Sequence, residues 1–114
     1  MKLKIKESAA KYLQEKMPSS DSYVFLALDD GSNKFSDLGG TCAIGDKFQF
    51  VFSSQPDEDY NQEIENNAGL KVSTSKEENA FLGENLILDY KNASLVLSDD
   101  SGILDGAVSN KKFD

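Results

Sequence analysis

The chain has 114 residues, of which 39% are hydrophobic and 28% charged, and its formal net charge at pH 7 is −8. This length and balance predict one globular domain over residues 1–114 with a core of modest size. The 20 acidic residues outnumber the 12 basic ones, so the chain repels phosphate and anionic lipid, which argues against nucleic acid and membranes as partners.

The N-terminal residues predict a strand followed by a helix. Residues 2–5 alternate polar and apolar side chains, as a strand with one buried face does. Residues 7–16 carry an apolar stripe at helical spacing, and Pro18 ends the helix because the residue before proline avoids the helical region. Residues 1–17 have no continuous apolar run typical of a signal peptide, and no run approaches the roughly 20 residues of a membrane span. We therefore expect a cytoplasmic protein.

Two buried strands are predicted next. Residues 22–28 are apolar on both faces, which is typical of a central strand. Residues 29–33 form a turn cluster rich in Asp, Gly and Asn. Residues 46–53 place three phenylalanines at every second position, so we expect a strand with an aromatic core face.

An acidic segment covers residues 55–67. Its acids at residues 57–59 are not followed by the glycine of a calcium-binding loop, so we interpret it as a solvated loop rather than a metal site. Residues 70–73 predict a short strand. Ser75 and Glu78 then fit a capping box, in which each side chain caps the helix start, and the helix is expected over residues 76–82.

The C-terminal part predicts a β-hairpin and a loose tail. Residues 85–90 and 93–98 are apolar runs that flank Lys91 and Asn92, which we take as the turn. Residues 110–114 are expected to fray. The whole pattern predicts an α+β protein with a mostly antiparallel curved sheet or two-layer β-sandwich, an N-terminal helix and one short helix.

Cys42 is the conspicuous reactive residue. It is the only cysteine, lies in the glycine-rich stretch 39–45, and occurs in a chain without histidine. Histidine-activated cysteine catalysis is therefore excluded, no pair of carboxylates is singled out by its spacing, and we expect no enzyme activity. A thiol in a glycine-rich stretch is suited to bind a soft metal, so Cys42 is a candidate metal ligand. The alternative is that Cys42 packs as a small hydrophobic residue.

The order of these elements resembles the HesB-like family, the A-type iron–sulfur cluster assembly proteins. Residues 3–11 are similar to the family's first strand and helix. Cys42, in a glycine-rich loop before an aromatic strand, matches the position of the family's first cysteine. Residues 69–73 and 81–90 match its second half, in which a strand and a short helix precede a Leu-Asp-Tyr-type strand.

The C-terminus departs from the family pattern. Members that carry clusters have a C-terminal Cys-Gly-Cys-type pair, and this chain has none. The resemblance thus implies Cys42 as one metal ligand where a cluster usually needs four. A homodimer would bring two thiolates and leave other positions to carboxylates, water or a small thiol. Asp99, Asp100 and Asp105 are oxygen donors near the place of the missing pair.

Two hypotheses follow from this resemblance. In the first, the protein is a non-enzymatic scaffold, carrier-like or accessory protein of iron–sulfur cluster biosynthesis. It would handle iron or an iron–sulfur cluster through Cys42 and contact assembly or client proteins. In the second, it is a divergent interaction module that keeps the fold and has lost cluster binding.

Overall fold

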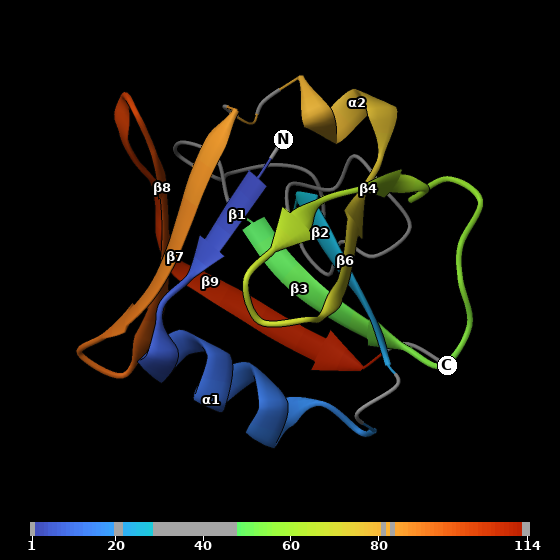
Figure 1. Ribbon diagram of the computed structural model, residues 1–114, viewed down its shortest axis with the longest axis horizontal. Coiled ribbons are helices and arrows are strands. Elements are labelled where there is room, and N and C mark those ends of the chain that lie inside the picture. The colour runs from blue at the N-terminus through green and yellow to red at the C-terminus, as the bar shows by residue number, and fades with distance from the viewer. Residues whose placement is uncertain (1, 20–21, 29–47, 81, 83, 113–114) are drawn as a thin grey trace, which may run out of the picture.

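The computed structural model describes residues 2–19, 22–28, 48–80, 82 and 84–112. Within them the chain forms nine strands and two helices (Figure 1). The helices are α1 (Glu7–Lys16) and α2 (Lys76–Asn79). The strands are β1 (Lys2–Ile5), β2 (Tyr23–Leu28), β3 (Phe48–Ser53), β4 (Gln62–Glu63), β5 (Glu65–Asn66), β6 (Lys71–Thr74), β7 (Asn85–Lys91), β8 (Ser94–Asp99) and β9 (Gly102–Lys112).

The strands form one sheet that curls into a nearly closed barrel. Their order is β4-β6-β2-β3-β9-β8-β7-β1-β5. The two outermost strands, β4 and β5, are separated in sequence by Ile64 alone. The Ile64 side chain is buried, and its amide donates to the Val72 carbonyl at 2.9 Å. One short segment therefore joins the two edges of the sheet.

The sheet is mixed, which corrects part of the predicted architecture. The α+β class is confirmed, but β1–β5, β1–β7, β2–β6 and β3–β9 are parallel pairs, against four antiparallel ones. The sheet is therefore neither mostly antiparallel nor a two-layer sandwich. Single-domain organisation over residues 1–114 stays a prediction.

Strand β9 is the main source of this difference. Residues 110–112, predicted to fray, belong to this eleven-residue strand. Its first part pairs with β8 in antiparallel fashion, and its last part runs parallel to β3, with Phe50 opposite Asn110. Figure 1 shows β9 crossing the molecule between the two halves of the sheet. Its polar sequence does not indicate a central strand. The strand is stabilised by backbone pairing with partner strands on both sides, and that pairing leaves no pattern in the side chains.

The aromatic face of β3 forms the centre of the main core, as predicted. Phe48, Phe50 and Phe52 are each at most 1% exposed, and all three belong to the same buried cluster. Helix α1 spans the predicted residues and packs Ala9 and Leu13, both fully buried, into that cluster. In Figure 1, α1 lies along one end of the curled sheet and α2 at the other.

Strand β2 buries both of its faces, as its sequence predicts. Val24, Leu26 and Leu28 belong to the main core. On the outer face, a second, smaller cluster consists of Phe25, Ala27, Val51 and Tyr60. The pairing of β2 with β3 on one side and β6 on the other leaves neither edge open. A central position thus explains the uninterrupted apolar run.

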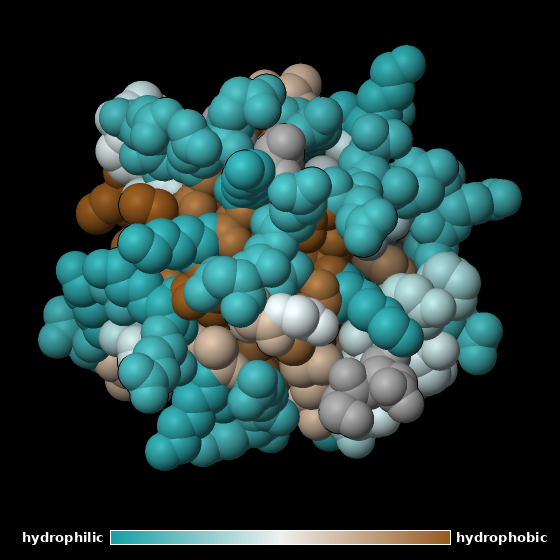
Figure 2. Space-filling view, in the orientation of Figure 1, coloured by the Kyte–Doolittle hydropathy of each residue, from teal (hydrophilic) through white to brown (hydrophobic). Residues whose placement is uncertain are grey.

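The view in Figure 2 shows a surface made mostly of hydrophilic residues, with apolar colour visible between them. No helix in the described part of the chain is long and apolar enough to cross a membrane.

The β7–β8 hairpin is confirmed, but its turn lies one residue further along than predicted. Asn92 and Ala93, rather than Lys91 and Asn92, lie between the paired strands. Both have positive φ, 52° and 62° respectively. Two successive residues of this kind make the turn whose twist fits a two-residue hairpin, and Asn tolerates this conformation far better than Ala.

We expect Ala93→Gly to raise the free energy of unfolding by about 0.5–1 kcal/mol, because glycine relieves the strain of a positive φ. Urea unfolding followed by circular dichroism measures the change. Ala107→Gly is the matched control, since Ala107 lies in β9 with an ordinary φ, and glycine there should destabilise the protein. A loss of stability in both variants would contradict this account of the turn.

Candidate functional site

The structure describes the two strand ends that flank the segment carrying Cys42, and we call these paired ends the base of the Cys42 segment. Cys42, the stretch 39–45 and the predicted turn at 29–33 lie outside the described residues. Leu28, which ends β2, and Phe48, which begins β3, are directly paired across the antiparallel ladder. The segment that carries Cys42 therefore leaves and re-enters the sheet at neighbouring positions.

Two buried carboxylates hold this base. Glu78 Oε2 accepts a hydrogen bond of 3.0 Å from the Leu28 amide, and Asp105 Oδ2 accepts one of 2.7 Å from the Phe48 amide. Glu78 is only 5% exposed and Asp105 only 7%. Gln49 Nε2 also donates to the Leu28 carbonyl at 3.2 Å. Charged acceptors make stronger hydrogen bonds than neutral ones, so both strand ends are fixed where the segment begins and ends.

Glu78 reaches this position because Ser75 caps the short helix. Ser75 Oγ accepts from the Glu78 amide at 3.0 Å, which confirms the predicted capping serine. The helix proper, Lys76–Asn79, is shorter than the predicted 76–82. The Glu78 carboxylate, predicted to cap the helix as well, lies against the Leu28 amide and the Tyr60 hydroxyl.

Tyr60 supplies the second hydrogen bond to Glu78. Its hydroxyl donates to Glu78 Oε1, and its ring lies 5.6 Å from that of Phe25, centroid to centroid. Burial, followed by this hydrogen bond, raises the pKa of Tyr60 above its usual range. The phenol therefore stays protonated and remains a hydrogen-bond donor to Glu78.

The three C-terminal aspartates are not brought together. Asp105 Oδ1 accepts from the Ala107 amide at 2.9 Å, so both of its oxygens bind backbone near the base. Asp99 lies at the end of β8, where hydrogen bonds from the side chain and then the amide of Ser101 hold the pKa of Asp99 below its usual range. Asp100 accepts from Asn85 Nδ2 at 3.1 Å. Among the described residues, no group of three or more Cys, Asp or Glu side chains could hold a metal ion.

The acidic segment 55–67 contains structure that the sequence analysis missed. Its acidic side chains are exposed, apart from a half-buried Asp57, as expected of a solvated segment. However, it forms β4 and β5, and Tyr60 and Ile64 are buried. The sequence did contain one signal for this structure, the single isoleucine between Glu63 and Glu65. Polar, apolar, polar alternation over three residues is enough to indicate one buried position.

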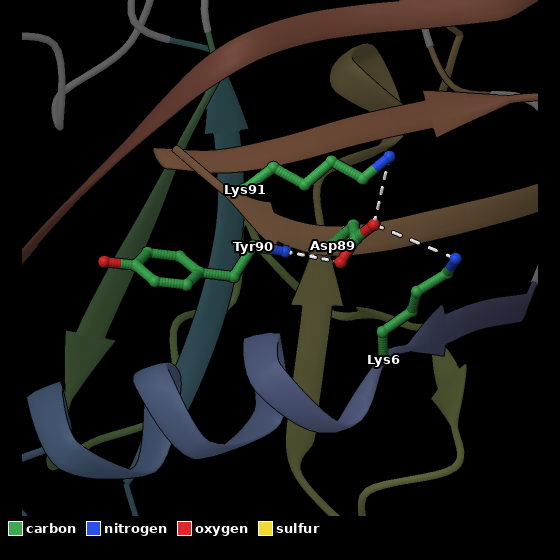
Figure 3. Close-up of polar contacts among 4 residues, drawn as sticks. All are labelled: Lys6, Asp89, Tyr90 and Lys91. Carbon is green, nitrogen blue, oxygen red and sulfur yellow. Dashed lines mark hydrogen bonds and ion pairs between the residues drawn. The ribbon is translucent and has the colours of Figure 1, made fainter. Parts of the chain in front are cut away.

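The Leu-Asp-Tyr segment of β7 connects the sheet to the start of α1. Asp89 Oδ2 lies 3.8 Å from Lys6 Nζ and 3.5 Å from Lys91 Nζ, between the two lysines in Figure 3. The Tyr90 amide donates to Asp89 Oδ1 at 2.8 Å. The Tyr90 ring stacks on Tyr12 of α1, with centroids 4.6 Å apart. The Leu-Asp-Tyr segment, on which part of the family resemblance rests, therefore holds β7 against α1.

We expect Asp89→Asn to lower the melting temperature at pH 7 but to have little effect near pH ~2. The hydrogen bond from the Tyr90 amide, and then the two lysines, lower the pKa of Asp89. A lowered pKa stabilises the fold above the usual Asp range of about 4, and this contribution disappears as the pH falls through the folded-state value. Glu15→Gln, an exposed acid on α1, is the control. Equal shifts at both pH values would contradict the assignment.

The fold recurs in solved structures. A crystal structure of a proposed Fe–S biosynthesis protein from Lactobacillus acidophilus is similar, with 32% identity and a TM-score of 0.83. The match covers 96% of this chain and 88% of that one. A second, from Lactobacillus salivarius and also a proposed Fe–S biosynthesis protein, has 28% identity and a TM-score of 0.80 over 99% of this chain and 98% of the other. No match was found among curated proteins.

The sequence itself carries the family signal over nearly its full length. A family model described as iron-sulphur cluster biosynthesis matches residues 1–112. The matched range includes all nine strands and both helices of the described structure. The family resemblance drawn from the sequence is thereby confirmed. The chain belongs to the iron–sulfur cluster biosynthesis family.

Proposed function

We propose that this protein acts without enzymatic chemistry in iron–sulfur cluster biosynthesis, as a scaffold, carrier-like or accessory protein. The family match over residues 1–112 is the observation that carries the proposal. The chain contains no histidine and one cysteine, so Cys42 is the only thiolate ligand that it offers. Iron or an iron–sulfur cluster is then the cargo rather than a resident cofactor.

The geometry around the base of the Cys42 segment supports this role. Glu78 and Asp105 fix the two strand ends from which the segment departs. The resemblance places the missing cysteine pair in the C-terminal segment 105–112. Asp105, at the start of that segment, accepts a hydrogen bond from the first residue of β3. The C-terminal strand therefore lies next to the position where the segment that carries Cys42 re-enters the sheet.

One thiolate per chain requires further ligands from elsewhere. Clusters are usually held by four cysteines, and a homodimer would supply two thiolates, with a small thiol or carboxylates in the remaining positions. Iron–sulfur assembly proteins or client proteins are the expected partners. The net charge of −8 disfavours nucleic acid and anionic membranes, and the single cysteine agrees with a cytoplasmic location.

Anaerobic reconstitution tests the proposal. The purified protein is incubated with ferrous iron and sulfide and desalted, after which visible absorbance, bound iron and molecular mass are measured. We expect the wild type to retain iron and Cys42→Ser to retain none. A Cys42→Ser, Ser101→Cys variant is the matched control, because it moves the thiol to an exposed turn. Equal iron in the wild type and Cys42→Ser would exclude Cys42 as the ligand.

The alternative is an interaction module that has kept the fold and lost cluster binding. The absence of cysteine after Cys42 favours it. In that case the wild type retains no iron beyond the level of Cys42→Ser, while its fold and its association with assembly proteins are unchanged by the substitution. The same reconstitution therefore distinguishes the two functions.

A further inference from the structure

A cavity of about 770 Å³ lies on the outer side of the sheet. Its floor is the outward face of β2 and β6, and its wall is the segment that leads from β3 to β4, at the right of Figure 1. We call it the outer cavity and use six of its residues below. They are Tyr23, Phe25, Asp57, Glu63, Glu65 and Lys71.

Strand register explains why acidic and aromatic side chains share this cavity. Phe25 pairs with Ser73, and Ser73 pairs with Glu63, so these three lie in one row across the sheet. Ile64 points into the main core with 2% exposure. Glu63 and Glu65, which end β4 and begin β5 on either side of Ile64, are exposed and both line the outer cavity. Two carboxylates therefore stand at the edge of an aromatic floor.

The outer cavity is electronegative and already accommodates one cation. Asp57, Glu63 and Glu65 against Lys71 give its lining a net charge of −2. Lys71 Nζ lies 5.0 Å from the centroid of the Tyr23 ring, so the floor presents an aromatic face that attracts positive charge. Within the described residues, the carboxylates of Glu63 and Glu65 make no hydrogen bond or ion pair, and both residues are exposed.

We propose that the outer cavity binds an extended basic segment of a partner protein, with Arg or Lys side chains at alternate positions against Glu63 and Glu65. Side chains two residues apart in an extended chain project on the same side about 7 Å apart. Glu63 and Glu65 are likewise two residues apart, on either side of Ile64, and both line the outer cavity, so one segment can pair with both. The aliphatic stems of the basic side chains cover the aromatic floor. This docking does not depend on cluster binding at Cys42.

Titration with a defined peptide tests the proposal. The probe is the acetylated, amidated peptide Ala-Arg-Ala-Arg-Ala, and its counterpart with citrulline at both Arg positions is the neutral control. Amide chemical shifts of the isotope-labelled protein are recorded at low salt. We expect the arginine peptide to shift amides of residues 57–73 and of β2, the citrulline peptide to shift none, and added salt to weaken binding.

Substitutions then locate the charge that matters. The Glu63→Gln, Glu65→Gln variant should weaken peptide binding about fivefold or more, because two exposed ion pairs are lost together. Lys71→Met should strengthen it about twofold by removing a competing cation. Glu15→Gln, Glu77→Gln removes the same charge from exposed positions outside the cavity and should leave affinity within about twofold.

Three results would overturn the inference: equal loss in the two double variants, shifts confined to other surfaces, or equal binding of the citrulline peptide. The first would mean that only net charge attracts the peptide. Circular dichroism of each variant confirms that folding is retained, which is expected because Glu63 and Glu65 are exposed.

Discussion

A chain that ends at Ser109 should lose about 3 kcal/mol or more of its free energy of unfolding, because each lost hydrogen bond between strands contributes about 1 kcal/mol. Residues 110–112 pair in parallel with Phe50, Val51 and Phe52 of the fully buried strand β3. Removing them opens one edge of that strand and brings water to the largest core side chains. Asn110 Nδ2 also donates to the Tyr12 hydroxyl at 3.0 Å, and this link to α1 is lost as well.

Urea unfolding followed by circular dichroism measures this effect, and amide hydrogen exchange locates it in β3. Lys112→Ala is the control, because it removes an exposed side chain and keeps the strand backbone; its effect should stay within about 0.5 kcal/mol. If truncation proved as mild as this control, the C-terminal residues would fray as the sequence alone suggests, and the parallel pairing with β3 would be wrong.

Glu78→Ala should destabilise the protein by about 3 kcal/mol, since a buried donor left without an acceptor costs about 1–3 kcal/mol. Two donors are affected, the Leu28 amide and the Tyr60 hydroxyl. Glu78→Gln keeps one acceptor oxygen but places an amide group against the other donor, so we expect an intermediate loss. The free energy of unfolding is again measured in urea at pH 7.

Glu77→Ala provides the matched comparison for Glu78→Ala. The two residues are neighbours on α2, but Glu77 is exposed whereas Glu78 is 5% exposed. The control should change stability by no more than about 0.5 kcal/mol. Similar values for Glu77→Ala and Glu78→Ala would show that the buried carboxylate does not hold the end of β2.

Local patterns in the sequence identified most of the elements that pack into the core. Alternation predicted β1 and the aromatic face of β3, and the 3.6-residue stripe together with Pro18 predicted the full extent of α1. The hairpin was located to within one residue, because Asn92 was recognised as a turn residue whereas the strained Ala93 was not. These successes rest on which face of an element is buried, and side-chain periodicity encodes that directly.

The family, and with it the interest in Cys42, also came from the sequence, through a resemblance in the order of the N-terminal helix, the glycine-rich stretch and the Leu-Asp-Tyr strand. The match over residues 1–112 confirms the family. Cys42 itself lies outside the described residues, and its role as a ligand stays a prediction.

Tertiary structure alone decided which strands are neighbours and what surrounds the base of the cysteine segment. Asp105 and Phe48 are 57 residues apart, and Glu78 and Leu28 are 50 apart, yet each pair is joined by a hydrogen bond. Periodicity specifies the face that a residue presents and carries no information about the partner on either edge of its strand. Strand β9 is polar and Ile64 is a lone apolar residue. Both are central to the fold only because their backbone groups pair with strands distant in the sequence.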